Sequence, residues 1–129
     1  MSRRLETVLL VDDEPDIRRI GELTLRAVGK LNVLLAASGL EAIELVLRER
    51  PDLVLLDVVM PGLDGPETFA RLRALDEGRD LPVIFLTARS HAAEVDRLRA
   101  LGATGVLAKP FDPMTLPARV REIFAAAQG

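Results

Sequence analysis

Five short runs of apolar residues, separated by longer stretches with helical periodicity, set the strongest limit on how this chain folds. Each run is almost continuously hydrophobic, which is typical of strands that are covered on both faces of a parallel sheet. The runs occupy residues 7–11, 31–36, 53–56, 83–86 and 105–108. We therefore expect an α/β protein with a five-stranded parallel sheet.

The stretches between these runs carry start and stop signals for helices. Pro15 suits the beginning of a first helix at about residues 14–28, and Ser38 is a plausible N-cap for a second that ends near residue 50. A third helix is expected to open at Gly65 and to end at Gly78, and a fourth to stop at Gly102. Strand and helix thus alternate five times, which predicts a (βα)5 three-layer sandwich with right-handed crossovers.

The last helix is expected from about residue 113. An inward-facing apolar stripe is predicted for it, made of Leu116, Val120, Ile123, Phe124 and Ala127. Pro117 is tolerable in the first turn of this helix and would kink it elsewhere.

Composition excludes several kinds of chemistry. The 129 residues suit a single domain over residues 1–129, with no output domain, and no apolar run approaches the roughly 20 residues of a membrane helix. The chain contains no cysteine and one histidine, His91, so disulfides, thiolate metal sites and a Ser-His-Asp triad are not expected. A net charge of −3 provides no field that attracts nucleic acid or an acidic membrane. We expect a cytoplasmic protein with neither as a partner.

Polar residues stand directly after four of the apolar runs. Asp12 and Asp13 follow the first run, Asp57 the third, Thr87 the fourth and Lys109 the fifth. In open parallel sheets the functional crevice lies beyond the carboxyl ends of the strands, so these side chains should converge. Carboxylates about 5 Å apart repel by roughly 3 kcal/mol, which calls for a cation with oxygen ligands, and Mg²⁺ fits.

All of these residues except Asp57, for which no local cap or turn calls for a charge, also have a simpler interpretation. Asp12 or Asp13 can cap the first helix, Thr87 can cap the helix after the fourth run, and a solvated Lys109 is possible. Taken together, they favour chemistry. A carboxylate beside Mg²⁺, a hydroxyl and an ammonium is suited to accepting a phosphoryl group as an acyl phosphate.

The same residues resemble the receiver domains of two-component response regulators over essentially the whole chain. The motifs are VDDEP, LVLLDVVMPGLDG, IFLTA and AKPF, in this order. The resemblance implies a flavodoxin-like fold and a phosphoacceptor at Asp57, assisted by Thr87 and Lys109. It further implies Mg²⁺ bound by Asp13 and Asp57, by Asp12 through water and by the backbone carbonyl of Val59, with a cis bond before Pro110.

The resemblance also implies a signalling role. A sensor histidine kinase or a histidine phosphotransfer protein would donate the phosphoryl group, and an unknown downstream protein would receive the signal. The domain would assist its own phosphotransfer and also its own dephosphorylation, which is slow, without being an enzyme. The resemblance also implies that Arg89, two residues after Thr87, borders the path of the water that attacks the phosphoryl group. Arg89 could therefore affect the lifetime of the phosphorylated form. His91 is not expected to be a phosphoryl donor, and an exposed position is the simpler interpretation.

One departure concerns output. Receivers usually have an aromatic switch residue three positions before the lysine, where this chain has Val106, and Phe111 could take over part of that role or belong to the core. An acidic partner could dock on a face formed by the fourth helix, last strand and last helix, or that face could simply be solvated. Its candidate residues are Arg97, Arg99, Arg119 and Arg121.

Three alternatives stay open. The chain could be a receiver-like scaffold that is not regulated by phosphorylation. A haloacid-dehalogenase-like phosphatase would need a second aspartate two residues after the nucleophile, where this chain has Val59. A flavin mononucleotide carrier would need a phosphate-binding loop rich in Gly, Ser and Thr after the first strand, where this chain has Asp12, Asp13 and Glu14.

Overall fold

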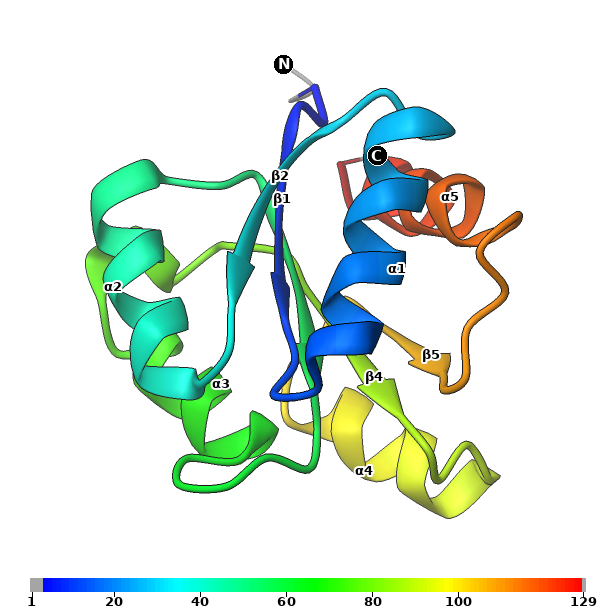
Figure 1. The fold of residues 1–129 in the computed structure, drawn as a ribbon. Coiled ribbons are helices and arrows are strands. Elements are labelled where there is room, and N and C mark those ends of the chain that lie inside the picture. The colour runs from blue at the N-terminus through cyan, green and yellow to red at the C-terminus, as the bar shows by residue number, and fades with distance from the viewer. Residues whose placement is uncertain (1–3, 129) are drawn as a thin grey trace.

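A parallel five-stranded sheet lies between two layers of helices in the computed structural model, which describes residues 4–128 (Figure 1). The elements in chain order are β1 (Thr7–Val11), α1 (Pro15–Ala27), β2 (Asn32–Ala36), α2 (Gly39–Glu49), β3 (Leu53–Asp57), α3 (Gly65–Arg73), the short 3-10 helix η1 (Asp76–Gly78), β4 (Val83–Thr87), α4 (Ala92–Ala100), β5 (Gly105–Ala108) and α5 (Leu116–Gln128). The strand order is β2-β1-β3-β4-β5, so the order reverses between β1 and β3. The predicted (βα)5 architecture is confirmed.

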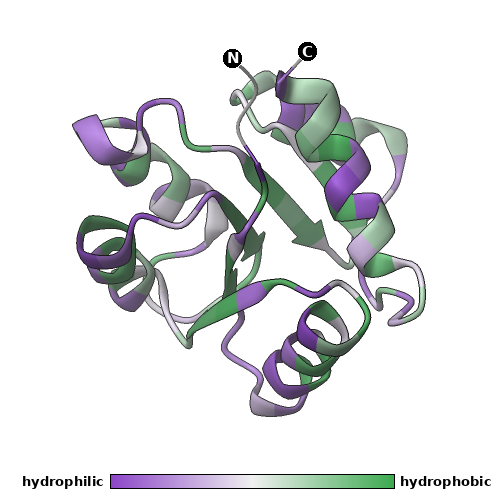
Figure 2. Cartoon of the chain, turned by 90° about the horizontal axis from the view of Figure 1, so that it is seen from above, coloured by the Kyte–Doolittle hydropathy of each residue, from purple (hydrophilic) through white to green (hydrophobic). Residues whose placement is uncertain are grey.

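Alternate residues of each strand enter two separate hydrophobic cores, one on each face of the sheet. In β1, Leu9 and Val11 pack into the core beneath α2, α3 and α4, whereas Val8 and Leu10 pack into the core beneath α1 and α5. Figure 2 shows the hydrophobic strands at the centre and hydrophilic residues on the helices around them. Because both faces are covered, the strands need apolar residues at nearly every position, which explains the continuous runs in the sequence.

Several helix ends follow from local chemistry. The Ser38 hydroxyl accepts a hydrogen bond from the Glu41 N–H and caps α2, as predicted. At the start of α3, Asp64 and Glu67 form a reciprocal capping box that the sequence analysis did not identify. These contacts satisfy N–H groups that have no partner within the helix.

Two expectations about the helices were wrong. The third helix ends at Arg73 and not at Gly78, because the chain turns into η1 after Leu75. In α5, Ala127 is exposed and lies outside the buried stripe. Pro117 is the second residue of α5, within the first turn, where its missing N–H costs no helical hydrogen bond.

No helix within residues 4–128 is long and apolar enough to cross a membrane.

Gly65 is required by a close approach between α3 and the end of β3. A Cβ atom at this position would lie 2.5 Å from the Asp57 carbonyl oxygen and 2.8 Å from the Val58 Cα. The helix therefore leaves room only for a hydrogen atom next to the strand that presents Asp57.

We expect Gly65→Ala to destabilise the protein by about 2 kcal/mol because alanine overpacks this contact. Helix propensity alone predicts the opposite sign, since alanine is favoured over glycine within helices. Gly62→Ala is the control: Gly62 has a φ of 74° and open space around it, so alanine costs only the left-handed backbone, about 1 kcal/mol. Urea denaturation measures both values, and a Gly65→Ala variant as stable as the wild type would contradict the overpacking argument.

Candidate functional site

The carboxyl ends of β1 and β3 bring three aspartates together, as the sequence predicted. Asp57 is the last residue of β3, and Asp12 follows β1, the neighbouring strand. Asp12 and Asp57 are buried and Asp13 is half-buried, and one carboxylate oxygen from each lies within 4.8 Å of the others. Three oxygen ligands therefore converge at the point where the strand order reverses.

Lys109 supplies the positive charge at this acidic edge. Its Nζ donates a hydrogen bond to Asp12 Oδ2 at 2.9 Å and lies 3.3 Å from Asp57 Oδ2. Lys109 follows β5, and its backbone N–H donates to the Thr87 carbonyl. The peptide bond between Lys109 and Pro110 is cis, as expected. The lysine is thus a half-buried partner of the carboxylates and not a solvated surface residue.

Asp12 has a second structural role that the capping interpretation described only in part. Its Oδ1 accepts a hydrogen bond from the Glu14 N–H at 2.9 Å. Glu14 is the N-cap residue of α1, and its side chain makes no capping hydrogen bond. The Arg18 side chain also donates to the Asp12 carbonyl at 2.6 Å. One carboxylate oxygen of Asp12 therefore stabilises the start of α1, and the other accepts the hydrogen bond from Lys109.

Burial and charge shift the pKa values of the central pair. Burial, together with the Asp12 charge, raises the pKa of Asp57 from 3.8 to about 6, against the opposing effect of Lys109. Burial opposes the charged form of Lys109, yet the hydrogen bond to Asp12 and the two carboxylates raise the pKa of the lysine. The lysine stays charged, and one cation does not offset three carboxylates.

The donor set of this edge fits a hard divalent cation. Three carboxylates with adjacent oxygens are ligands that Mg²⁺ accepts, and a cavity of about 500 Å³ beside them leaves room for water and a substrate oxygen. Asp13, Asp57 and Val59 line this cavity. Glu14 lines it too, a residue of the VDDEP motif that the sequence analysis did not place in the site.

Thr87 lies beside the acidic edge, although its hydroxyl does not point to the carboxylates. Its side chain is buried and accepts a hydrogen bond from the Arg89 N–H at 3.0 Å. Thr87 and the exposed Arg89 line a neighbouring cavity, which shares Val59 with the cavity of the acidic edge. Val59 is 75% exposed at this shared wall.

The two candidates for a switch residue lie on opposite faces of the sheet. Val106 is half-buried and packs against the core beneath α2, α3 and α4. Phe111 packs against the core beneath α1 and α5. Phe111 is therefore half-buried against this core and does not occupy the environment in which an aromatic residue at position 106 would move.

Two of the four arginines expected on one docking face point elsewhere. Arg121 turns to α1 and donates a hydrogen bond to the Gly29 carbonyl at 2.5 Å. Arg97 is paired with Glu94 at 2.7 Å and lines the cavity next to Thr87. His91 is exposed, as expected, and its Nδ1 accepts a hydrogen bond from the Glu94 N–H as the N-cap of α4. This capping role was not predicted.

The strand order and the acidic edge define the class of protein: a phosphoacceptor domain with the flavodoxin-like fold. Comparison with known proteins gives the family. A model of the response regulator receiver domain matches residues 8–121, and the chain belongs to this family.

Solved structures and curated relatives agree with this assignment. The chemotaxis protein CheY4 of Vibrio cholerae has a TM-score of 0.85 and 33% identity, with coverage of 93% of this chain and 99% of that chain. The receiver domain of the sensor histidine kinase PA1611 from Pseudomonas aeruginosa PAO1, which holds a magnesium ion in its active site cleft, has a TM-score of 0.82 and 31% identity, with coverage of 95% and 99%. The probable transcriptional regulator ycf27 of Porphyridium aerugineum is 42% identical over 92% of this chain and 48% of its own length.

These relatives correct one expectation about partners. Exclusion of nucleic acid rested on the net charge of −3, but the matched relatives include proteins named as probable transcriptional regulators. The chain spans about half the length of the curated relatives that it matches. The charge of the shared half does not decide what a protein twice as long binds, so the exclusion was wrong.

We expect Asp57→Asn to stabilise the metal-free protein by about 2 kcal/mol at pH 7. Because folding raises the pKa of Asp57 to about 6, ionisation of this carboxylate disfavours the folded state, and stability is lost as the pH rises through that value. Asparagine removes the charge and the repulsion from Asp12. Urea denaturation at pH 4 and pH 7 in the presence of a chelator measures the effect.

The gain should be large at pH 7 and small at pH 4, where wild-type Asp57 is largely protonated. Asp96→Asn is the control, because Asp96 is exposed on α4 and should change stability by less than about 0.5 kcal/mol. An Asp57→Asn variant that is less stable than the wild type at pH 7 would contradict the repulsion argument.

Proposed function

We propose that Asp57 accepts a phosphoryl group from a phosphohistidine on a sensor histidine kinase or a histidine phosphotransfer protein. The observation that supports this most is the position of Lys109, whose Nζ lies 2.9 Å from Asp12 and 3.3 Å from Asp57. The lysine holds a buried carboxylate at the end of a central strand, next to an open cavity. A phosphoryl group can enter there without rearrangement of the sheet.

In the transfer, a carboxylate oxygen of Asp57 forms a bond to phosphorus while the phosphorus–nitrogen bond of the phosphohistidine breaks. The electron pair of that bond stays with the histidine ring. Lys109 already contacts Asp57 and is placed to neutralise charge on the phosphoryl oxygens. The Thr87 hydroxyl can donate to one of these oxygens after its side chain leaves Arg89.

Asp12, Asp13, Asp57 and the backbone carbonyl of Val59 are the groups that we propose hold Mg²⁺. The ion would supply positive charge that the incoming phosphoryl oxygens require. The clustered carboxylate oxygens support this assignment, and the fit is better for Mg²⁺ than for a softer metal because residues 4–128 contain no cysteine and the single histidine caps α4.

Two competing functions are less compatible with the site. A phosphatase of the haloacid-dehalogenase type needs a proton donor two residues after its nucleophile, and Val59 has no titratable group. A scaffold without phosphorylation would not need to bury two mutually repelling carboxylates, which costs stability.

We propose that the phosphorylated domain acts in the cytoplasm. There it loses the phosphoryl group slowly and signals to a further protein or protein segment.

Incubation with acetyl phosphate or phosphoramidate and Mg²⁺ tests the acceptor directly. We expect intact-mass measurement to show a gain of one phosphoryl group, because these small donors replace the phosphohistidine. Asp57→Asn should lose the gain, whereas Asp96→Asn, with its exposed carboxylate on α4, should keep it. The absence of a mass gain with either donor would favour the unphosphorylated scaffold.

We expect Arg89→Ala to shorten the lifetime of the phosphorylated form by more than about twofold, which corresponds to about 0.4 kcal/mol in the barrier. The exposed Arg89 lines the cavity next to Thr87, from which it can pair with the phosphoryl group and restrict water. Removal of the donor followed by timed intact-mass measurement gives the rate. Arg99→Ala, at an exposed position of α4 outside this cavity, is the control, and equal rates in both variants would refute a role for Arg89.

A further inference from the structure

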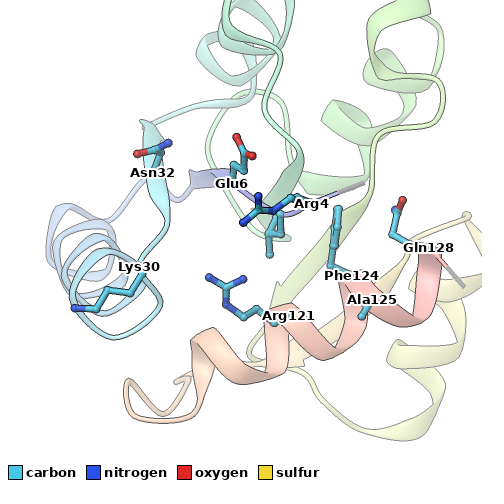
Figure 3. Close-up of a pocket in the computed structure, with 9 residues that line it drawn as sticks. Arg4, Glu6, Lys30, Asn32, Arg121, Phe124, Ala125 and Gln128 are labelled. Atoms are coloured by element: carbon cyan, nitrogen blue, oxygen red, sulfur yellow. The ribbon is translucent and has the colours of Figure 1, made fainter. Parts of the chain in front are cut away.

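A third cavity lies at the opposite end of the sheet from the acidic edge. It has a volume of about 610 Å³, within the range of small-molecule sites. The segment that leads into β1, the start of β2, the turn after α1 and the second half of α5 surround it (Figure 3). Its charge is opposite to that of the acidic edge: Arg4, Lys30 and Arg121 line it together with one carboxylate, Glu6.

Two guanidinium groups face the same space in this cavity. Figure 3 shows the side chains of Arg4 and Arg121 extending toward one another, while Lys30 lies at the outer rim. Among residues 4–128, neither arginine forms an ion pair with a carboxylate. Other arginines of the chain have such partners, for example Arg97 with Glu94. The cations of the cavity thus keep donors available for a ligand.

The wall that holds Arg121 is fixed by tight packing. The Arg121 guanidinium donates to the Gly29 carbonyl at 2.5 Å, and a Cβ atom at Gly29 would lie 2.6 Å from the Leu25 carbonyl oxygen and 3.0 Å from Pro117 Cβ. The end of α1 is therefore pressed against α5. The next residue, Lys30, has a φ of 58°, a left-handed conformation that costs a residue other than glycine about 1 kcal/mol. The turn places one of the two lysines of the chain at the rim in spite of this cost.

The apolar part of the cavity adds a second element of recognition. Leu5, Phe124 and Ala125 line it beside the charged groups. A ligand that fits both parts has an anionic head and a small apolar body. Three cations and one carboxylate give the cavity a formal charge of +2, which matches a phosphate monoester dianion better than a single carboxylate. Guanidinium groups also bind phosphate through paired hydrogen bonds.

We propose that this cavity binds a small organic phosphate monoester, with Arg4 and Arg121 on the phosphate and Leu5 and Phe124 against the apolar body. The site is independent of phosphorylation at Asp57, because its residues lie before β1, at the start of β2 and on α5, and none lines the cavity at the acidic edge. Binding would join the segment before β1 to α5, which Arg121 already connects to the end of α1 through Gly29.

Titration of the ¹⁵N-labelled chain with phenyl phosphate, followed by amide chemical shifts, tests the proposal. The buffer holds a chelator, so that the acidic edge repels the probe. We expect saturable shifts that centre on the amides of Lys30, Asn32 and Arg121. Benzoate and inorganic phosphate, which lack the phosphate head and the apolar body respectively, should each bind at least about fivefold more weakly.

The variants Arg4→Gln and Arg121→Gln should each weaken phenyl phosphate binding by about tenfold, the loss expected for a charge-assisted hydrogen bond. Arg4→Gln removes no hydrogen bond of the described structure, so it reports on the ligand even if Arg121→Gln disturbs the contact with Gly29. Arg119→Gln is the matched control, since Arg119 lies on α5 outside this cavity and should keep the wild-type affinity.

Three results would overturn the proposal: shifts that do not saturate, an equal loss of affinity in Arg119→Gln, or binding of benzoate or inorganic phosphate as tight as that of phenyl phosphate. The phosphorylation assay at Asp57 is a separate measurement, and its failure would leave the amide shifts unaffected. The two functions of the domain can therefore be refuted independently.

Discussion

The contact of Lys109 with Asp12 and Asp57 is the interaction on which the rest of the site depends. It joins residues that follow β5 and β1 to the last residue of β3, and β4 lies between β3 and β5 in the sheet. Without this ammonium, two buried carboxylates would face each other with no opposite charge in the site, which costs several kcal/mol. Burial and the Asp12 charge keep the pKa of Asp57 raised in spite of the lysine, and a single ammonium faces three carboxylates, so the edge stays deficient in positive charge. A shortage of this kind is what makes the edge receptive to a divalent cation, so stability and function conflict at the same atoms.

The parts of the fold that were predictable are those set by burial on both faces of the sheet. Runs 7–11 and 105–108 match β1 and β5, because a strand covered on both faces needs apolar residues throughout. The expected strands 53–56 and 83–86 were each one residue short, since β3 and β4 continue into Asp57 and Thr87. Both residues are polar and buried, and they extend the strands into the functional site. A prediction based on hydrophobicity alone therefore ends each strand one residue too early, at the first residue of the site.

Side-chain directions were less predictable, because they depend on packing between distant segments. The sequence grouped Arg121 with Arg97 on one face, yet Arg121 turns to the Gly29 carbonyl, a contact between residues 92 positions apart. Phe111 lies two residues after Lys109, but its side chain packs against the core under α1 and α5. Thr87 was placed correctly at the end of β4, while the direction of its hydroxyl depends on the Arg89 N–H in the following loop.

Net charge was the least informative quantity, because it sums two ends of the sheet that have opposite charge. The carboxyl edge concentrates three aspartates around one lysine, whereas the other end gathers Arg4, Lys30 and Arg121 around Glu6. Charges separated by the length of a strand, roughly 17 Å or more, are beyond the Debye length in physiological salt, so each end acts on its own ligands. A value of −3 for the chain consequently describes neither surface. Nor does this value describe the half of the relatives that lies outside the match, so their partners do not follow from the charge of this domain, and each surface has to be assessed separately.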